Sequence, residues 1–170
     1  MTFAPVLTVH ADTPAQTADL AERLAPRLRL GDVVLLRGGL GAGKSHFARA
    51  LIKARLAALG RDEDVPSPTY TLVQSYDLDI VELLHADLYR LSDPQEVFEL
   101  GLDQAFDTAI CLIEWPERLG DLTPRAALEI MISQGQQDEA RAITFCCADG
   151  SDWAARLADL VARPVAPGPA

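Results

Sequence analysis

Hydrophobic residues along this chain fall into two patterns, spaced helical stripes and short continuous runs. Residues 15–29 place leucines on one face at helical spacing and predict an amphipathic helix, which Pro26 distorts or ends. A helical pattern returns over 46–59 and stops at Gly60. Between these helices, the run VVLLR at 33–37 is short and continuously apolar up to its final arginine and contains β-branched residues, which is typical of a strand buried on both faces.

Further apolar runs predict the remaining strands of a sheet, separated by polar turns and short helices. The expected strands span residues 69–76, 80–87, 109–115, 126–132 and 141–147. The expected short helices lie around residues 94–99 and over 151–163. Strands that alternate with helices predict an α/β fold with a mixed, mostly parallel central sheet flanked by helices. We expect a single domain over residues 1–162 and a disordered tail over 163–170.

The composition is that of an ordinary globular protein, since 49 % of the 170 residues are hydrophobic and 24 % are charged. No apolar run approaches the roughly 18 residues that a membrane-spanning helix needs, and the N-terminus lacks the pattern of a signal peptide. We therefore expect a cytoplasmic protein with no membrane partner. The net charge of −10 would repel RNA, so a role in an RNA pathway would run through protein partners.

The cysteines Cys111, Cys146 and Cys147 show no zinc-binding spacing, and two of them are neighbours. All three fall in predicted strands. We expect reduced thiols that pack as small hydrophobic side chains.

A glycine-rich segment follows the strand at 33–37 directly and leads into the next helix. It matches the pattern GxxxxGK[ST] through Gly38, Gly43, Lys44 and Ser45. Glycines let backbone N–H groups wrap a phosphate chain, and a helix N-terminus favours an anion. Lys44 can bridge the terminal phosphates while Ser45 ligates Mg²⁺, so the segment predicts a P-loop NTPase fold that binds a nucleotide. The expected nucleotide-binding residues of this segment are Gly38, Gly39, Leu40, Gly41, Ala42, Gly43, Lys44, Ser45 and His46.

A metal ion at such a loop requires a second anchor, an acid at the end of a neighbouring apolar strand. Glu114 and Asp87 both end apolar runs, and parallel strands would bring both to the side of the loop. We assign Glu114 to Mg²⁺, through water, and Asp87 to the attacking water or the outer sphere of the metal, although the two roles can be exchanged. Lys44, Asp87 and Glu114 are the expected catalytic residues. The chain contains no asparagine, which excludes the guanine-selecting NKxD motif and makes ATP the expected nucleotide.

Five segments in a fixed order carry a resemblance to a known family. They are GLGAGKS at 39–45, SPTYTLV at 67–73, HADLYRL at 85–91, ELGL at 99–102 and IEWPE at 113–117. In this combination the chain resembles the TsaE (formerly YjeE) family, the bacterial ATPase subunit of tRNA threonylcarbamoyladenosine synthesis. The resemblance runs from about residue 12 to about residue 147.

The resemblance implies an ATPase that works with TsaD and TsaB. That system places a threonylcarbamoyl group on the adenosine beside the anticodon of ANN-reading tRNAs, and the ATPase meets tRNA only through the complex. The resemblance also implies metal positions at Ser45 and Glu114, a switch-region or catalytic acid at Asp87, a mobile segment near the phosphates with Thr69 and Thr71, a packing residue at Trp115, a basic position near the nucleotide at Arg141, and Thr17 near the base.

Two departures from the family pattern lie in the loop itself. Gly39 stands where the family usually has an acid, and Ser45-His46 stands where it usually has Thr-Thr. Serine still offers a hydroxyl to Mg²⁺, so the metal chemistry is retained.

Several alternatives stay open at the level of the sequence. His85 faces the same side of its strand as Asp87, so it either orients that acid or is an ordinary buried histidine. The ring of His46 is expected to be incidental. Two rival functions are a small-molecule kinase, against which the acidic 60–66 and 92–108 segments argue, and a non-catalytic ATP-binding module, against which the two acids argue.

Overall fold

The computed structural model describes residues 2–93 and 95–161. Within these residues seven strands form one sheet in the order β1-β7-β6-β2-β5-β4-β3. The strands are β1 (Ala4–Ala11), β2 (Val33–Arg37), β3 (Val73–Asp77), β4 (Glu82–Asp87), β5 (Ala109–Glu114), β6 (Leu128–Gln134) and β7 (Arg141–Cys147). The predicted tail over 163–170, residue 94 and the end of the predicted last helix lie outside the described residues.

Strand direction gives the sheet its mixed character. Strands β6, β2, β5 and β4 are neighbours and run parallel. Strands β7 and β3 run antiparallel to β6 and β4, and β1 is antiparallel to β7, so it returns to the common direction. Among the described strands, only β7 and β3 therefore oppose the others, which confirms the prediction of a mixed, mostly parallel sheet.

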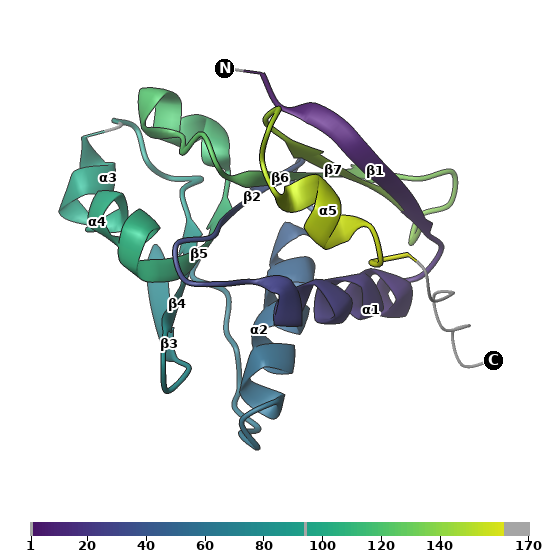
Figure 1. Ribbon diagram of the computed structural model, residues 1–170, viewed down its shortest axis with the longest axis horizontal. Helices are drawn as coiled ribbons and strands as arrows, with labels where there is room; N and C mark the ends of the chain where they lie inside the picture. The colour runs from purple at the N-terminus through teal and green to yellow at the C-terminus, as the bar shows by residue number, and fades with distance from the viewer. Residues whose placement is uncertain (1, 94, 162–170) are drawn as a thin grey trace.

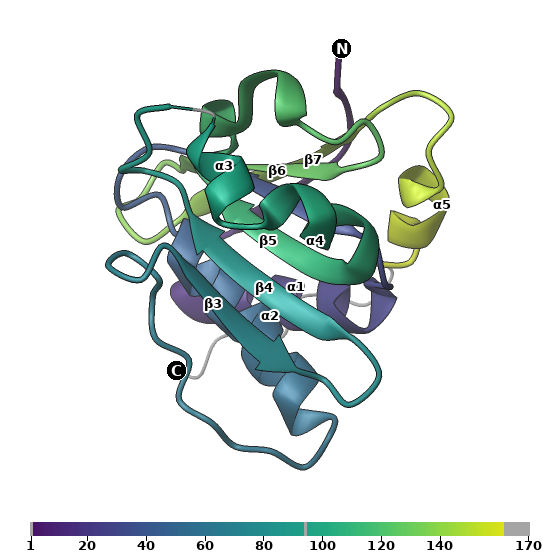
Figure 2. The ribbon, with the colours of Figure 1, turned by 90° about the vertical axis from the view of Figure 1, so that its left-hand side faces the viewer.

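Helices cover both faces of the sheet (Figures 1 and 2). The α-helices are α1 (Pro14–Leu24), α2 (Lys44–Ala57), α3 (Glu96–Glu99), α4 (Leu102–Thr108) and α5 (Trp153–Leu157), and the 3-10 helices are η1 (Ala25–Arg27) and η2 (Pro116–Leu122). One hydrophobic core forms between the sheet and α1, α2 and α5. A second, smaller core forms on the opposite face under α3, α4 and η2. The resulting three layers bury β2 and β5 on both faces.

The first helix begins and ends where local chemistry requires. Thr13 caps it by accepting a hydrogen bond from the Gln16 N–H at 3.3 Å, and Pro14 supplies the first helical residue. The α-helix ends at Leu24 and continues as η1, because Pro26 has no N–H to donate to the helix. The predicted distortion at this proline is confirmed.

The second helix starts two residues earlier than its hydrophobic pattern indicates. Gly43 has φ 110° and acts as its N-cap, so Lys44 and Ser45 already lie in the first turn. Phe47 and Leu51, both fully buried, then face the sheet. The helix thus begins with the two residues that the motif requires at the end of a phosphate loop.

Strand boundaries differ from the prediction where a turn interrupts an apolar run. The strand predicted from residue 69 begins only at Val73, because Leu72 has φ 65° and donates its N–H to the Pro68 carbonyl at 2.8 Å. Likewise, the strand predicted from residue 80 begins at Glu82, after a tight turn that contains Asp79 with φ 68°. A residue with positive φ breaks the extended backbone in both places.

Two further elements have no counterpart in the prediction. Strand β1 is an edge strand in which the inward residues Leu7, Val9 and Ala11 alternate with the exposed residues Val6, Thr8 and His10, a period-two pattern that the prediction above does not use. Helix α4 is only seven residues long and follows Gly101, which has φ 70°. The predicted helix over 151–163 is shorter, since α5 covers Trp153–Leu157. In the described ranges, no helix has both the length and the apolar character needed to cross a bilayer.

Parallel strand ends fix where a site can form. Leu36 of β2 lies opposite Glu114 of β5, and Glu114 lies opposite Asp87 of β4. The loop after β2 and both acids therefore share one edge of the sheet, as the sequence predicts.

Helix α2 gives a direct test of this packing. We expect Phe47→Ala to lower the free energy of unfolding by about 3–5 kcal/mol, because it removes a fully buried ring between α2 and the sheet. Lys53→Ala, on the exposed side of the same helix, should change it by less than about 0.5 kcal/mol. Urea denaturation followed by circular dichroism measures both values, and equal effects would contradict the packing described.

The cysteines give a second test. All three are free and buried, as predicted, and burial raises the pKa of the Cys111 thiol to about 12. Only the thiolate reacts with a disulfide reagent, so Cys111 should stay unmodified in the native protein at pH 8 and react once denaturant unfolds the chain. Mass spectrometry after labelling locates the modified residue, and rapid native labelling of Cys111 would refute its burial.

Candidate active site

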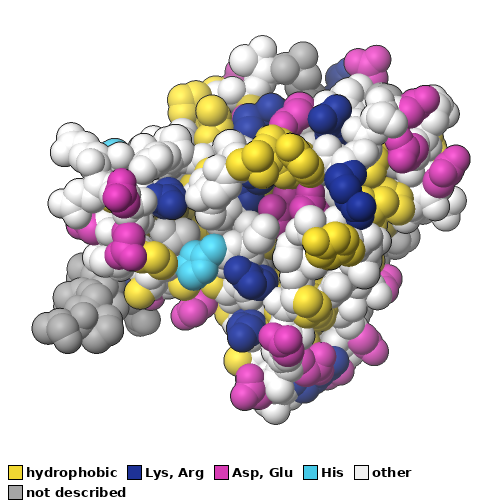
Figure 3. All heavy atoms as spheres, turned by 180° about the vertical axis from the view of Figure 1, so that it is seen from behind, with side chains coloured by type: hydrophobic (Ala, Val, Ile, Leu, Met, Phe, Trp, Pro, Cys, Tyr) yellow, Lys and Arg dark blue, Asp and Glu magenta, His cyan; other side chains and the backbone are white. Residues whose placement is uncertain are grey.

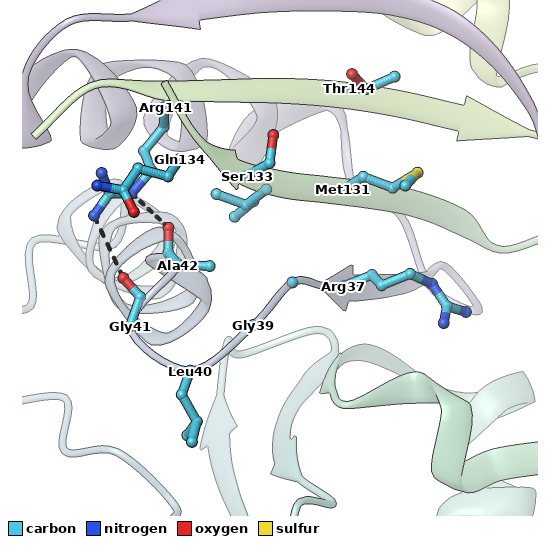
Figure 4. A pocket seen from close by; sticks show the side chains of 12 residues that line it. Arg37, Gly39, Leu40, Gly41, Ala42, Met131, Ser133, Gln134, Arg141 and Thr144 are labelled. Atoms are coloured by element: carbon cyan, nitrogen blue, oxygen red, sulfur yellow. Dashed lines mark hydrogen bonds between the residues drawn. The ribbon is translucent and has the colours of Figure 1, made fainter. Parts of the chain in front are cut away.

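The loop between β2 and α2 approaches the sheet so closely that its first residue has no room for a side chain. A Cβ at Gly38 would lie 2.4 Å from the carbonyl oxygen of Ile132 in β6. Gly41 and Gly43 have φ 71° and 110°, in the region that favours glycine. Figure 4 shows this loop curving from the end of β2 to the start of α2. The glycines of the motif thus meet conformational and steric requirements of the backbone.

Lys44 folds back over this loop. Its side chain is 5 % exposed, and its Nζ donates to the carbonyl oxygens of Gly38 and Gly39 at 2.8 Å each. The Nζ also lies 3.9 Å from the centroid of the Trp115 ring, within the range of a cation–π contact. The ammonium group is therefore held at the inner rim of the loop.

Burial lowers the pKa of Lys44, while the negative charges of Glu114, Asp87 and Glu117 oppose that shift. Desolvation disfavours the ammonium form, and the three carboxylates favour it. A further anion placed at this nitrogen would act in the same direction as the carboxylates.

Glu114 ends β5 with a carboxylate that is almost fully buried and fully hydrogen-bonded. Only 2 % of the residue is exposed. Its Oε2 accepts the hydroxyl of Ser45 at 2.8 Å, and its Oε1 lies 2.8 Å from Nε2 of His85. The structure thus joins the strand-end acid to the first turn of α2, which is the pair that the sequence predicts.

Asp87 lies beside this pair at the end of β4. It is 7 % exposed, and its Oδ1 accepts the backbone N–H of Tyr89 at 3.0 Å. The hydroxyl of Thr69 donates to its Oδ2 at 3.4 Å. Asp87 and Thr69 therefore meet across the cleft mouth, whereas Thr71 is exposed and contacts Gln74 instead.

His85 shows a partner different from the one weighed in the sequence. It is fully buried and bonds to Glu114, and no hydrogen bond joins it to Asp87 among the described contacts. The spacing of two residues places His85 and Asp87 on one face, but only the strand register brings the ring to Glu114. Knowledge that β4 and β5 are adjacent and parallel would have revealed this contact.

Trp115 follows Glu114 and ends the strand with φ 59°. Its ring centroid lies 4.8 Å from that of Tyr89, at an interplanar angle of 50°. The unusual backbone turns the indole over Lys44. The sequence predicts a packing role for Trp115. It does not reveal that the indole contacts Lys44 and Tyr89.

Arg141 of β7 supports the loop from behind (Figure 4). Its Nε donates to the carbonyl of Ala42 at 2.8 Å, and a terminal nitrogen donates to that of Gly41 at 3.4 Å. The other terminal nitrogen donates to the carbonyls of Asp138 and Ala140. The guanidinium thereby ties the β6–β7 hairpin to the loop.

Thr17 belongs to α1, and the His46 side chain reaches that helix. The ring of His46 hydrogen-bonds to the carbonyl of Pro14 at 2.8 Å, so the ring joins α2 to α1. Thr17 is 1 % exposed, and its hydroxyl has no hydrogen-bond partner in the part of the chain that the structure describes. Thr17 does not line the cleft described next, and its place near a nucleotide base stays a prediction.

A cleft of about 400 Å³ lies in front of the loop. It is lined by Leu40, Gly41, Gly43, Lys44, Ser45, His46, Arg49, Thr69, Asp87, Tyr89, Glu114 and Trp115. A separate hollow of about 430 Å³ lies behind the loop, against β6 and β7 (Figure 4). Figure 3 shows one face of the molecule, on which basic, acidic and hydrophobic side chains lie close together.

Comparisons with known proteins agree on one family. The family described as "Threonylcarbamoyl adenosine biosynthesis protein TsaE" matches residues 11–143. A "tRNA threonylcarbamoyladenosine biosynthesis protein TsaE" from Rickettsia felis is 40 % identical over 115 residues, which cover 68 % of this chain and 66 % of that protein, just under two thirds of its length.

A protein of the same name from Bacillus subtilis is 37 % identical over 133 residues, covering 78 % of this chain and 80 % of that protein. The crystal structure of YdiB from Bacillus subtilis matches with a TM-score of 0.75 and 29 % identity, over 94 % of this chain and 96 % of the other. These matches confirm the predicted P-loop fold and the resemblance carried by the five sequence segments. This chain belongs to the TsaE family.

Proposed function

We propose that this protein binds and hydrolyses MgATP to support transfer of the threonylcarbamoyl group to the adenosine beside the anticodon of ANN-reading tRNAs, acting with TsaD and TsaB. Membership of the TsaE family supports the pathway, because relatives are named for tRNA threonylcarbamoyladenosine biosynthesis. The cleft supports the chemistry.

The observation that carries the proposal is the contact between Ser45 Oγ and Glu114 Oε2, at 2.8 Å beside a glycine loop. A hydroxyl from the first helical turn and a carboxylate from the neighbouring strand end are the protein oxygens that hold Mg²⁺ in P-loop NTPases. Mg²⁺ prefers oxygen and takes its remaining ligands from phosphates and water.

The loop offers the complement to a polyphosphate. Its glycine backbone leads into the N-terminus of α2, where N–H groups without helical partners favour an anion. Lys44 lies at its inner rim, donating to the carbonyls of Gly38 and Gly39. We expect phosphate oxygens to compete for the Lys44 ammonium, and Mg²⁺ to supply the charge neutralisation at Ser45 and Glu114. The backbone of the segment from Gly39 to His46 would then contact phosphate as well.

Asp87 is the candidate to orient the attacking water. Its carboxylate is nearly buried, lies opposite Glu114 in register and is held by Tyr89 and Thr69. Such a group accepts a hydrogen bond from water without moving. Thr69 lines the same cleft and is the candidate to close it over the terminal phosphate.

Partners are expected to raise the rate of hydrolysis. Three arginines beside the loop are already engaged, because Arg49 donates to the Ser45 carbonyl, Arg141 donates to the Ala42 carbonyl, and Arg37, which precedes Gly38, pairs with Glu129. A positive charge supplied by a partner would stabilise the negative charge of the transition state, as an added arginine does in other P-loop enzymes.

Contact with tRNA is expected only through the complex, because the chain carries a net charge of −10 that would repel RNA. We expect this complex to act in the cytoplasm.

The nucleotide site is tested by two substitutions. We expect Lys44→Ala to weaken ATP binding by about tenfold or more, because it removes the ammonium that faces the phosphates. Glu114→Ala should leave ATP binding in EDTA within about threefold but lower Mg²⁺-dependent hydrolysis by about a hundredfold. Calorimetric titration and phosphate release measure these effects.

Lys53→Ala is the matched control, since Lys53 is an exposed lysine of the same helix. It should bind and hydrolyse ATP like the wild type. Equal turnover by the wild type and Glu114→Ala would refute the assignment of Glu114 to the metal.

The pathway is tested by adding TsaD and TsaB. We expect slow hydrolysis by the isolated protein, a rise of about tenfold or more with both partners, and a fall in Asp87→Ala under both conditions. Phosphate release with and without the partner proteins measures this rise. If the rate of ATP hydrolysis is the same with and without TsaD and TsaB, the proposed nucleotide site is retained and the proposed pathway is refuted.

A further inference from the structure

Glu114 receives a hydrogen bond on each of its oxygens. Ser45 Oγ donates to Oε2 at 2.8 Å, and His85 Nε2 lies 2.8 Å from Oε1. Ser45 is half-buried at the cleft wall, whereas His85 is fully buried behind it. The carboxylate is therefore held from two sides, once from the cleft and once from the core.

The two ring nitrogens of His85 differ in their hydrogen bonding. Its Nδ1 is buried and has no hydrogen-bond partner in the part of the chain that the structure describes. Buried polar atoms are rarely left without a partner, so a leucine would serve packing better at this position. The one hydrogen bond that the described structure gives the His85 side chain is with Glu114. Because an ionised carboxylate oxygen can only accept a hydrogen bond, the ring donates through hydrogen on Nε2 in this contact.

The register of the sheet sets this contact. His85 lies opposite Leu112 and Asp87 lies opposite Glu114, in adjacent parallel strands. Residues two apart on a strand share a face, so the ring lies on the same face as both acids, one step further from the strand ends. A strand of the sheet therefore fixes the ring, and the ring fixes the carboxylate.

We propose that His85 is a positioning residue for Glu114: its Nε2–H holds Oε1, so that Oε2 stays directed toward Ser45 and the metal position. The inference rests on the proposed function, because the metal is expected at Ser45 and Glu114. His85 itself touches neither nucleotide nor metal in this assignment. Its effect passes through the orientation of one carboxylate.

The test compares the gain in ATP affinity that Mg²⁺ provides. Calorimetric titrations measure the affinity for ATP in EDTA and for MgATP in the wild type, His85→Leu and His85→Gln. We expect His85→Leu to bind ATP in EDTA within about twofold of the wild type but to lose about tenfold of the Mg²⁺-dependent gain. His85→Gln, whose amide can donate from a similar position, should keep that gain within about threefold.

Leu83→Ala is the matched structural control, because Leu83 is fully buried on the same face of β4 and does not contact Glu114 in the described structure. It should lower the melting temperature while it leaves the Mg²⁺-dependent gain unchanged. The inference is overturned if His85→Leu keeps the gain, if His85→Gln loses as much as His85→Leu, or if Leu83→Ala loses it equally.

A second measurement is independent of nucleotide. Nitrogen-15 NMR of the His85 ring should show hydrogen on Nε2 in the wild type and a changed Nε2–H resonance in Glu114→Ala. A ring with hydrogen only on Nδ1 would overturn the inference. If the wild type binds no ATP, the proposed function fails, and the NMR result still decides whether His85 holds Glu114.

Discussion

The buried carboxylate of Glu114 is the constraint on which the site depends. A carboxylate that is 2 % exposed is costly unless its oxygens are hydrogen-bonded, and here Ser45 and His85 supply those bonds. Ser45 can do so only if α2 begins at the loop, and His85 only if β4 lies parallel beside β5. The satisfaction of one acid thus links a helix start, a loop and a strand register.

The backbone of the loop adds a second constraint that acts at shorter range. Gly38 passes so close to Ile132 that a Cβ would lie 2.4 Å from its carbonyl oxygen. Strand β6 must therefore lie next to β2, as the parallel pairing of these strands requires. Arg141 then closes the arrangement by donating to Ala42 from β7. The loop is consequently held by β6 and β7 on one side, while Glu114 bonds to Ser45 at its end.

Much of this arrangement could be predicted from the sequence, and what could not has a physical reason. Local signals predict one metal position for Ser45 and Glu114. These signals are the glycine motif, the buried strand before it and the acids at strand ends. The contact of His85 with Glu114 depends on which strands are neighbours, which no local pattern contains. The turn at Leu72 depends on a backbone conformation that overrides its hydrophobic pattern, whereas the alternation of Leu7, Val9 and Ala11 in β1 is a local signal that the prediction does not use.

The two loop positions at which the sequence analysis expects a departure from the family pattern differ in their structural meaning. A Cβ at Gly39 would meet nothing within 4 Å, so packing does not require glycine there, and the carbonyl of this residue still accepts from Lys44. His46 instead has a defined contact, since its ring reaches the carbonyl of Pro14 at 2.8 Å. A threonine hydroxyl is shorter than an imidazole and would not span to α1 from the same backbone position. The histidine therefore couples the start of α2, where phosphate is expected, to the first turn of α1.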